Sequence, residues 1–160
     1  MLGLGGMRVL GVDFGTRRIG LALSDHSAML ARPWQTIEAG PTPADSARSV
    51  TQLLERGRIT GDDDVADVGA IVVGLPRRLN GADNEQTQPA RDFASALADL
   101  ARVPVRLQDE RLSSHEAESR LSVTEKDWRR RKAQLDAAAA AVILQDYLDQ
   151  ASTSQGPASR

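Results

Sequence analysis

The chain has 160 residues, 41% of them hydrophobic, which is enough to build the core of one domain. It has no cysteine, which excludes disulfides and thiolate metal sites, and only two histidines, so a bound metal ion would be held mainly by oxygen atoms. The formal net charge is −2, from 20 basic and 22 acidic side chains, so affinity for nucleic acid depends on where the cations lie.

Apolar runs are short throughout the sequence. None approaches the ~20 residues needed to cross a bilayer, and the N-terminus lacks the pattern of a signal peptide. We therefore expect a cytoplasmic protein without a membrane partner.

The first half of the chain has the pattern of three strands followed by a helix. Residues 1–6 carry no structural pattern and are expected to form a disordered extension. Strands are predicted at residues 8–14, 18–24 and about 30–37. The connections between them are so short that antiparallel neighbours are favoured. Pro41 and Pro43 indicate a loop, and a helix is expected from about 44 to 56.

The second half alternates strands and helices. Residues 68–75 form a nearly unbroken apolar run, typical of a central strand buried on both faces. Beyond it we expect a polar loop at about 77–84, a helix to about 101, a strand at 103–110, a short helix at 113–121, a loop carrying basic residues and a last helix at about 135–150. Residues 151–160 are small and polar and are expected to be a disordered tail.

This order predicts an α/β fold in one domain, residues 7–150. Three antiparallel strands followed by strand–helix crossovers give a mixed sheet in which the last two strands are parallel, with helices on both faces.

Three acids are candidates for chemistry. Asp13 ends the first strand beside a glycine turn, whose backbone can approach a phosphate closely. Asp109 and Glu110 end the fifth strand, where side chains alternate, and Glu110 shares the more polar face. Asp136 opens the apolar stripe of the last helix. Each acid alone also has a structural explanation, as part of a hairpin turn, a solvated strand end and a helix N-terminus, respectively.

Taken together, the three acids predict a metal-binding site, which none of them predicts alone. Asp13, Glu110 and Asp136 can converge at one edge of the sheet, where their charges would repel one another. Divalent cations with oxygen ligands relieve such repulsion, and two of them ~4 Å apart can activate water and stabilise the leaving oxygen of a phosphodiester.

Basic residues near these acids are candidates for phosphate contacts. Two arginine pairs, Arg17–Arg18 and Arg77–Arg78, lie beside glycine-bearing turns, and Arg111 follows Glu110. A basic run adds Lys126, Arg129, Arg130, Arg131 and Lys132, with Trp128 placed to stack on a base. An ordinary solvated loop is the alternative explanation of that run, and Trp128 is equally suited to anchor it.

Four motifs resemble those of one family. VDFGTRRIGLALSD, VVGLP, QDERLS and LDAAAAAVILQDYL occur in the order and spacing of the YqgF/RuvX family, described as candidate Holliday junction resolvases and as candidate nucleases for the 5′ end of pre-16S ribosomal RNA. The match runs from about residue 7 to 149. The resemblance implies a ribonuclease H-like fold, a Mg²⁺- or Mn²⁺-dependent site at Asp13, Glu110 and Asp136, and structured RNA or branched DNA as partner. Ala137 departs from the family, in which many members have Lys at this position.

Two other functions remain open from the sequence. Kinases and chaperones of the actin-like superfamily use a similar DxGT turn for ATP phosphates, although they usually need a second domain. A non-catalytic nucleic-acid-binding factor of ribosome assembly would keep the basic run without needing the acids. Neither the choice between RNA and DNA nor the oligomeric state follows from the sequence.

Overall fold

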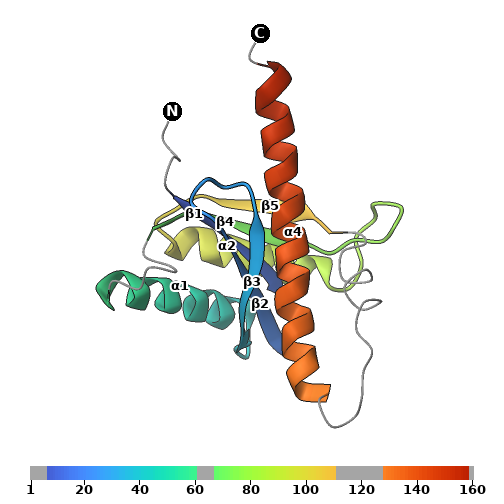
Figure 1. Cartoon of the computed structure of the whole chain (residues 1–160). Coiled ribbons are helices and arrows are strands. Elements are labelled where there is room, and N and C mark those ends of the chain that lie inside the picture. Colours follow the sequence, from blue (N-terminus) through green and yellow to red (C-terminus); the bar gives the residue numbers. More distant parts are fainter. Residues whose placement is uncertain (1–6, 61–66, 111–127, 159–160) are drawn as a thin grey trace.

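The computed structural model describes residues 7–60, 67–110 and 128–158. Its five strands form one mixed sheet in the order β3-β2-β1-β4-β5 (Figure 1). The strands are β1 (Arg8–Phe14), β2 (Arg18–Ser24), β3 (Ala31–Glu38), β4 (Val68–Leu75) and β5 (Val105–Asp109). The strands β1, β2 and β3 are antiparallel neighbours, whereas β4 is parallel to β1 and β5 is parallel to β4. The predicted mixed sheet is confirmed.

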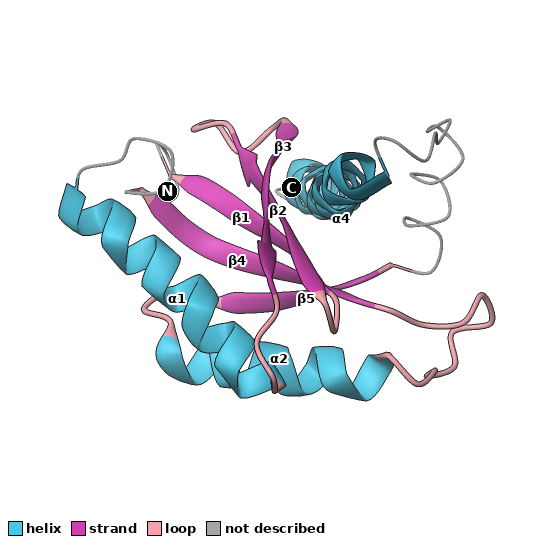
Figure 2. Cartoon of the chain, turned by 90° about the horizontal axis from the view of Figure 1, so that it is seen from below, coloured by secondary structure: helices cyan, strands magenta, loops and turns pink. Residues whose placement is uncertain are grey.

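Helices cover both faces of this sheet (Figure 2). The helices α1 (Pro43–Thr60) and α2 (Thr87–Leu100) lie on one face, and α4 (Trp128–Ala158) lies on the other. Large aliphatic side chains of the sheet pack with Val50 of α1 and Phe93 of α2 in one core. A second core joins Val9, Ala22 and Val72 to α4. Side chains that alternate along each strand thus supply two separate apolar layers.

Several element boundaries differ from those expected. The strands β1, β2 and β4 begin and end where predicted, because each is an apolar run bounded by turn residues. The helix α1 begins at Pro43, which had been placed in the loop; the fixed φ of proline suits the first position of a helix. The strand β5 is shorter than predicted at both ends. The predicted helix at 113–121 and the extension 1–6 lie outside the described residues.

The last helix is longer than predicted at both ends. It begins at Trp128 rather than near residue 135, so the basic run at 128–132 belongs to a helix and not to a loop. Arginine and lysine are good helix formers, and this stretch contains no glycine or proline. The helix continues to Ala158, into the segment expected to be disordered. Residues 151–155 contain no helix breaker, and Gly156 and Pro157 follow in its last turn. Within the described residues, no helix is both long and apolar enough to span a membrane.

The inward face of α4 agrees with the predicted stripe. Ala139, Ala140 and Ile143 are buried against the sheet, as expected, and Leu144 and Leu148 extend the same contact. Asp136 lies about two turns inside the helix rather than at its N-terminus. The explanation of Asp136 as an acid that stabilises a helix start is therefore wrong.

Candidate functional site

A cavity of about 770 Å³ opens beside the end of β1. Asp13 of β1, Glu110 directly after β5, and Asp136 of α4 all line it, so acids far apart in the sequence meet at one place. The turn after β1 and the start of α2 complete its wall. The other lining residues are Phe14, Gly15, Thr16, Arg17, Arg18, Pro76, Arg77, Asn84, Glu85, Gln86, Pro89, Leu135 and Ala139.

Asp13 is the most strongly perturbed acid of the cavity. It lies on the α4 side of β1, opposite Gly20 of β2 in the strand register. Burial, and then the negative charge of Asp136, raise the pKa of Asp13 from 3.8 to about 7. Ionising Asp13 in this position therefore costs free energy unless a cation is bound beside it.

Asp136 is held by an arginine of the neighbouring strand. The Nε atom of Arg18 donates a hydrogen bond of 3.1 Å to Oδ2 of Asp136. Both side chains are partly exposed at the cavity, so this ion pair is accessible to solvent. Arg18 therefore acts as a counterion of Asp136 in the described structure.

Glu110 faces the cavity, whereas Asp109 does not line it. The backbone nitrogen of Glu110 donates to the carbonyl oxygen of Leu75, which fixes the strand end. Gly74 leaves room for the side chain, because a Cβ atom there would stand 3.0 Å from Cδ of Glu110. Asp109 turns away and forms an ion pair of 3.8 Å with Arg77. Of the two acids that end the predicted strand, the structure thus places Glu110, and not Asp109, at the cavity.

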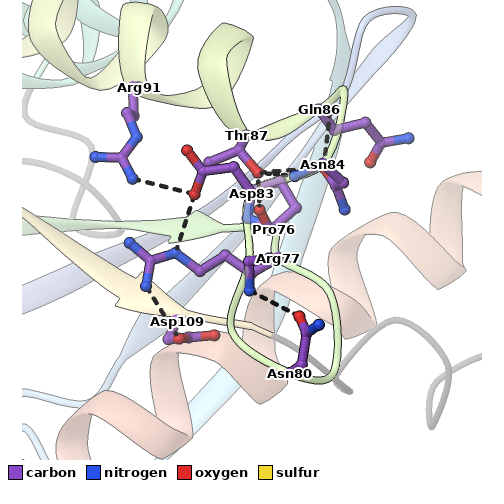
Figure 3. Close-up of polar contacts among 10 residues, drawn as sticks. Pro76, Arg77, Asn80, Asp83, Asn84, Gln86, Thr87, Arg91 and Asp109 are labelled. Atoms are coloured by element: carbon purple, nitrogen blue, oxygen red, sulfur yellow. Dashed lines mark hydrogen bonds and ion pairs between the residues drawn. The ribbon is translucent and has the colours of Figure 1, made fainter.

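In each of the two predicted arginine pairs, one arginine contacts an acid of the protein and the other is exposed. In the first, Arg18 pairs with Asp136 while Arg17 is exposed at the cavity. In the second, Arg77 lies between Asp83, at 3.7 Å, and Asp109 (Figure 3). Its neighbour Arg78 is exposed. These two contacts of Arg77 are too long for hydrogen bonds. One arginine of each pair is thus engaged within the protein, and its neighbour is exposed to solvent.

The loop between β4 and α2 forms a wall that sequence reasoning missed. Thr87 is fully buried and donates its hydroxyl to the carbonyl oxygen of Pro76 at 2.5 Å (Figure 3). The same hydroxyl accepts a hydrogen bond from the backbone nitrogen of Asn84, and Oδ1 of Asn84 accepts one from Gln86. Asn84 and Thr87 flanking a helix start were the available signal, since such residues bond to nearby backbone.

The remaining predicted contacts belong to the sequence that runs from the end of β5 into the first turns of α4. Arg111 and Lys126 lie outside the described residues. Trp128, Arg129, Arg130, Arg131 and Lys132 form the first turns of α4. Within the described ranges, no group of three or more His, Cys, Asp or Glu side chains is arranged, as it stands, to hold a metal ion. The acids line one cavity without forming a closed cluster.

The fold places the chain among known nuclease-type folds by comparison with a solved structure. RuvC of Thermus thermophilus, solved in complex with a Holliday junction substrate, matches the structure with a TM-score of 0.51 at 16% identity, over 93% of this chain and 97% of that chain. That likeness establishes the ribonuclease H-like fold.

Sequence comparison then identifies the family. The RuvX family, described as Holliday junction resolvase, matches residues 7–150, and the chain belongs to it. A relative from Anaeromyxobacter sp. named "Putative pre-16S rRNA nuclease" is 43% identical over 89% of this chain and 97% of its own length. One of the same name from Maridesulfovibrio salexigens is 41% identical over 91% of this chain and 100% of its own length. These relatives support a nuclease role.

Proposed function

We propose that the chain is a metal-dependent endonuclease that hydrolyses phosphodiester bonds in structured nucleic acid. The main observation in support is that Asp13, Glu110 and Asp136 line one cavity together with arginine side chains. The names of the relatives favour 5′-end processing of pre-16S ribosomal RNA, and the family description keeps Holliday junctions as the other substrate.

The donor chemistry of the cavity fits a divalent cation. Its acids are carboxylates, which Mg²⁺ and Mn²⁺ prefer. Burial, and then the negative charge of Asp136, raise the pKa of Asp13, so a cation would relieve the cost of ionising it. Asp13, Glu110 and Asp136 would hold the cation, and Asp136 would exchange its contact with Arg18 for it. A bound cation would supply the activation of water and the stabilisation of the leaving oxygen.

The arginines of the cavity have separate roles in this proposal. Arg17 is exposed at the cavity and is placed to hold a phosphate of the substrate. Arg18 keeps Asp136 in place before the cation binds and is then available to the substrate. Arg77 braces the loop between β4 and α2 against the end of β5, next to Glu110.

The surface around the cavity favours recognition of backbone shape. Aromatic residues make up 3% of the chain, too few for an extended stacking platform. Arginines beside turns, and the basic first turns of α4, suit phosphates rather than base edges. Such a surface gains most where two backbone segments approach together, as in a junction or a folded RNA end.

A cleavage panel tests this function. Junction DNA, matched duplex DNA and precursor RNA containing the 5′ end of 16S RNA are incubated at one salt concentration with Mg²⁺, Mn²⁺, Ca²⁺ or chelator. We expect cleavage with Mg²⁺ or Mn²⁺, little with Ca²⁺, and 5′-phosphate products, with precursor RNA or junction cut faster than duplex. Full activity in chelator would exclude the metal-dependent reaction, and binding without cleavage would indicate a non-catalytic assembly factor.

A further inference from the structure

The sheet face beneath α4 is rich in small residues, although Val9 and Val72 also lie in it. Gly11 of β1, Gly20 of β2 and Gly74 of β4 all point towards this helix, and Ala22 and Ala70 lie in the same layer. The helix adds small residues of its own, because Ala137, Ala139 and Ala140 are buried. The buried strand side chains of the opposite face are leucine, isoleucine and valine, with no glycine or alanine among them. The backbones of α4 and the sheet therefore approach closely on one side only.

Gly20 is where this approach is tightest. A Cβ atom on Gly20 would stand 3.0 Å from the backbone nitrogen of Ala137 and would overlap the carbonyl group of Asp136. Both obstacles are backbone atoms, which cannot rotate away as the end of a side chain can. A methyl group at this position would force α4 and β2 apart.

The tight contact lies between two of the cavity acids. Gly20 is paired with Asp13 in the register of β1 and β2, so the two residues are direct neighbours across the strands. Its contact on α4 is Asp136 itself. Arg18, two residues earlier on the same face of β2, binds the carboxylate of Asp136. Strand β2 thus holds Asp136 by its backbone and by its side chain.

We propose that Gly20 is a positioning residue: its missing side chain lets the backbone of α4 at Asp136 rest directly on β2 and thereby sets the spacing between Asp136 and Asp13. The inference rests on the proposed function, because this spacing matters for chemistry only if the two acids share a cation. A misplacement of about 1 Å in a catalytic site can cost about 100-fold in rate. Loss of a residue that orients metal ligands typically costs roughly 10- to 100-fold in metal affinity.

The test compares two glycine substitutions under the same helix. Gly20→Ala strains α4 at Asp136, whereas Gly11→Ala strains it at Leu144, where the added Cβ would stand 2.7 Å from Cβ of Leu144. That second contact is about 12 Å further along the helix. Mn²⁺ binding is measured by calorimetry, and crystal structures of both variants locate α4. We expect Gly20→Ala to bind Mn²⁺ roughly 10- to 100-fold more weakly and Gly11→Ala to bind it as the wild type does.

A longer acid supplies the matched rescue. Asp136→Glu extends the carboxylate by one methylene group, so it should weaken Mn²⁺ binding in the wild type and restore binding in Gly20→Ala. Merely loosened packing would not be corrected by this change. A variant that is unfolded in buffer is measured in trimethylamine N-oxide, which favours the compact state.

The possible results separate this inference from the proposed function. A folded Gly20→Ala protein with α4 in its original place, or with unchanged Mn²⁺ affinity, overturns the positioning role. Equal losses in Gly20→Ala and Gly11→Ala, with no rescue by Asp136→Glu, also overturn it. A wild-type protein that binds no Mn²⁺ overturns the proposed metal site, and with it the functional meaning of Gly20, even if α4 moves.

Discussion

Replacing Asp13 by asparagine should stabilise the cation-free protein. The pKa of Asp13 in the fold is about 7 against 3.8 as its ordinary value, so the folded protein binds the proton more tightly than the unfolded chain. Ionised Asp13 therefore lowers stability as pH rises from about 4 to 7, and the loss is complete above that range. The difference in pKa corresponds to ~4 kcal/mol at most. Because Asp13 is partly exposed, we expect on the order of 2 to 4 kcal/mol.

Urea unfolding in chelator measures this effect directly. At pH 8, Asp13→Asn should be more stable than the wild type by that amount, and at pH 4 the two should be nearly equal. Asp99→Asn, which changes an exposed aspartate of α2, is the control and should leave the stability difference near zero at both pH values. If Asp13→Asn is no more stable than the wild type at pH 8, or if its advantage does not depend on pH, the electrostatic strain inferred for this site does not exist.

Three further predictions concern the arginines of the cavity, the backbone at Ala28 and the basic start of α4. Arg17→Ala should weaken nucleic-acid binding and leave the free energy of unfolding within about 0.5 kcal/mol, because Arg17 is exposed at the cavity. Arg77→Ala, which removes the contacts to Asp83 and Asp109, should lower the free energy of unfolding by about 1 kcal/mol. Equal effects of the two variants in filter binding and urea unfolding would refute these separate roles. Ala28 has a φ of 57°, so Ala28→Gly should raise stability by about 1 kcal/mol, and a lower melting temperature would contradict the strain. Neutralising Arg129, Arg130, Arg131 and Lys132 should reduce the log–log salt dependence of duplex binding by about 3 to 4; an unchanged slope would exclude phosphate contacts there.

The strands could be predicted from the sequence because local signals suffice for them. The apolar runs of β1, β2 and β4 end at turn residues, so their limits are set by neighbours in the chain. The start of α4 could not be predicted in this way. The sequence from Trp128 to Lys132 was interpreted as a loop because of its charge. Arginine and lysine are nevertheless good helix formers, so this charge does not oppose a helix.

The convergence of the acids was also within reach of the sequence, but their partners were not. Asp13 and Glu110 stand at the ends of strands, and Asp136 stands on the inward stripe of a helix, so topology alone brings them to one edge. Which arginine of a pair meets an acid depends on where other elements place that acid. Arg18 reaches Asp136 because α4 rests on β2 at this point, and Gly20 has no side chain to keep the two backbones apart.

Single-turnover cleavage by four variants tests the central claim most directly. Asp13→Asn, Glu110→Gln, Asp136→Asn and the triple variant are compared with the wild type on precursor RNA and junction DNA in Mn²⁺, after each is shown to be folded. If the three carboxylates act as one unit, each single change should lower the rate nearly as far as the triple change does, so the losses will not add. A single variant that keeps most of the wild-type rate, free of contaminating nuclease, would contradict the assignment of that acid to the catalytic site.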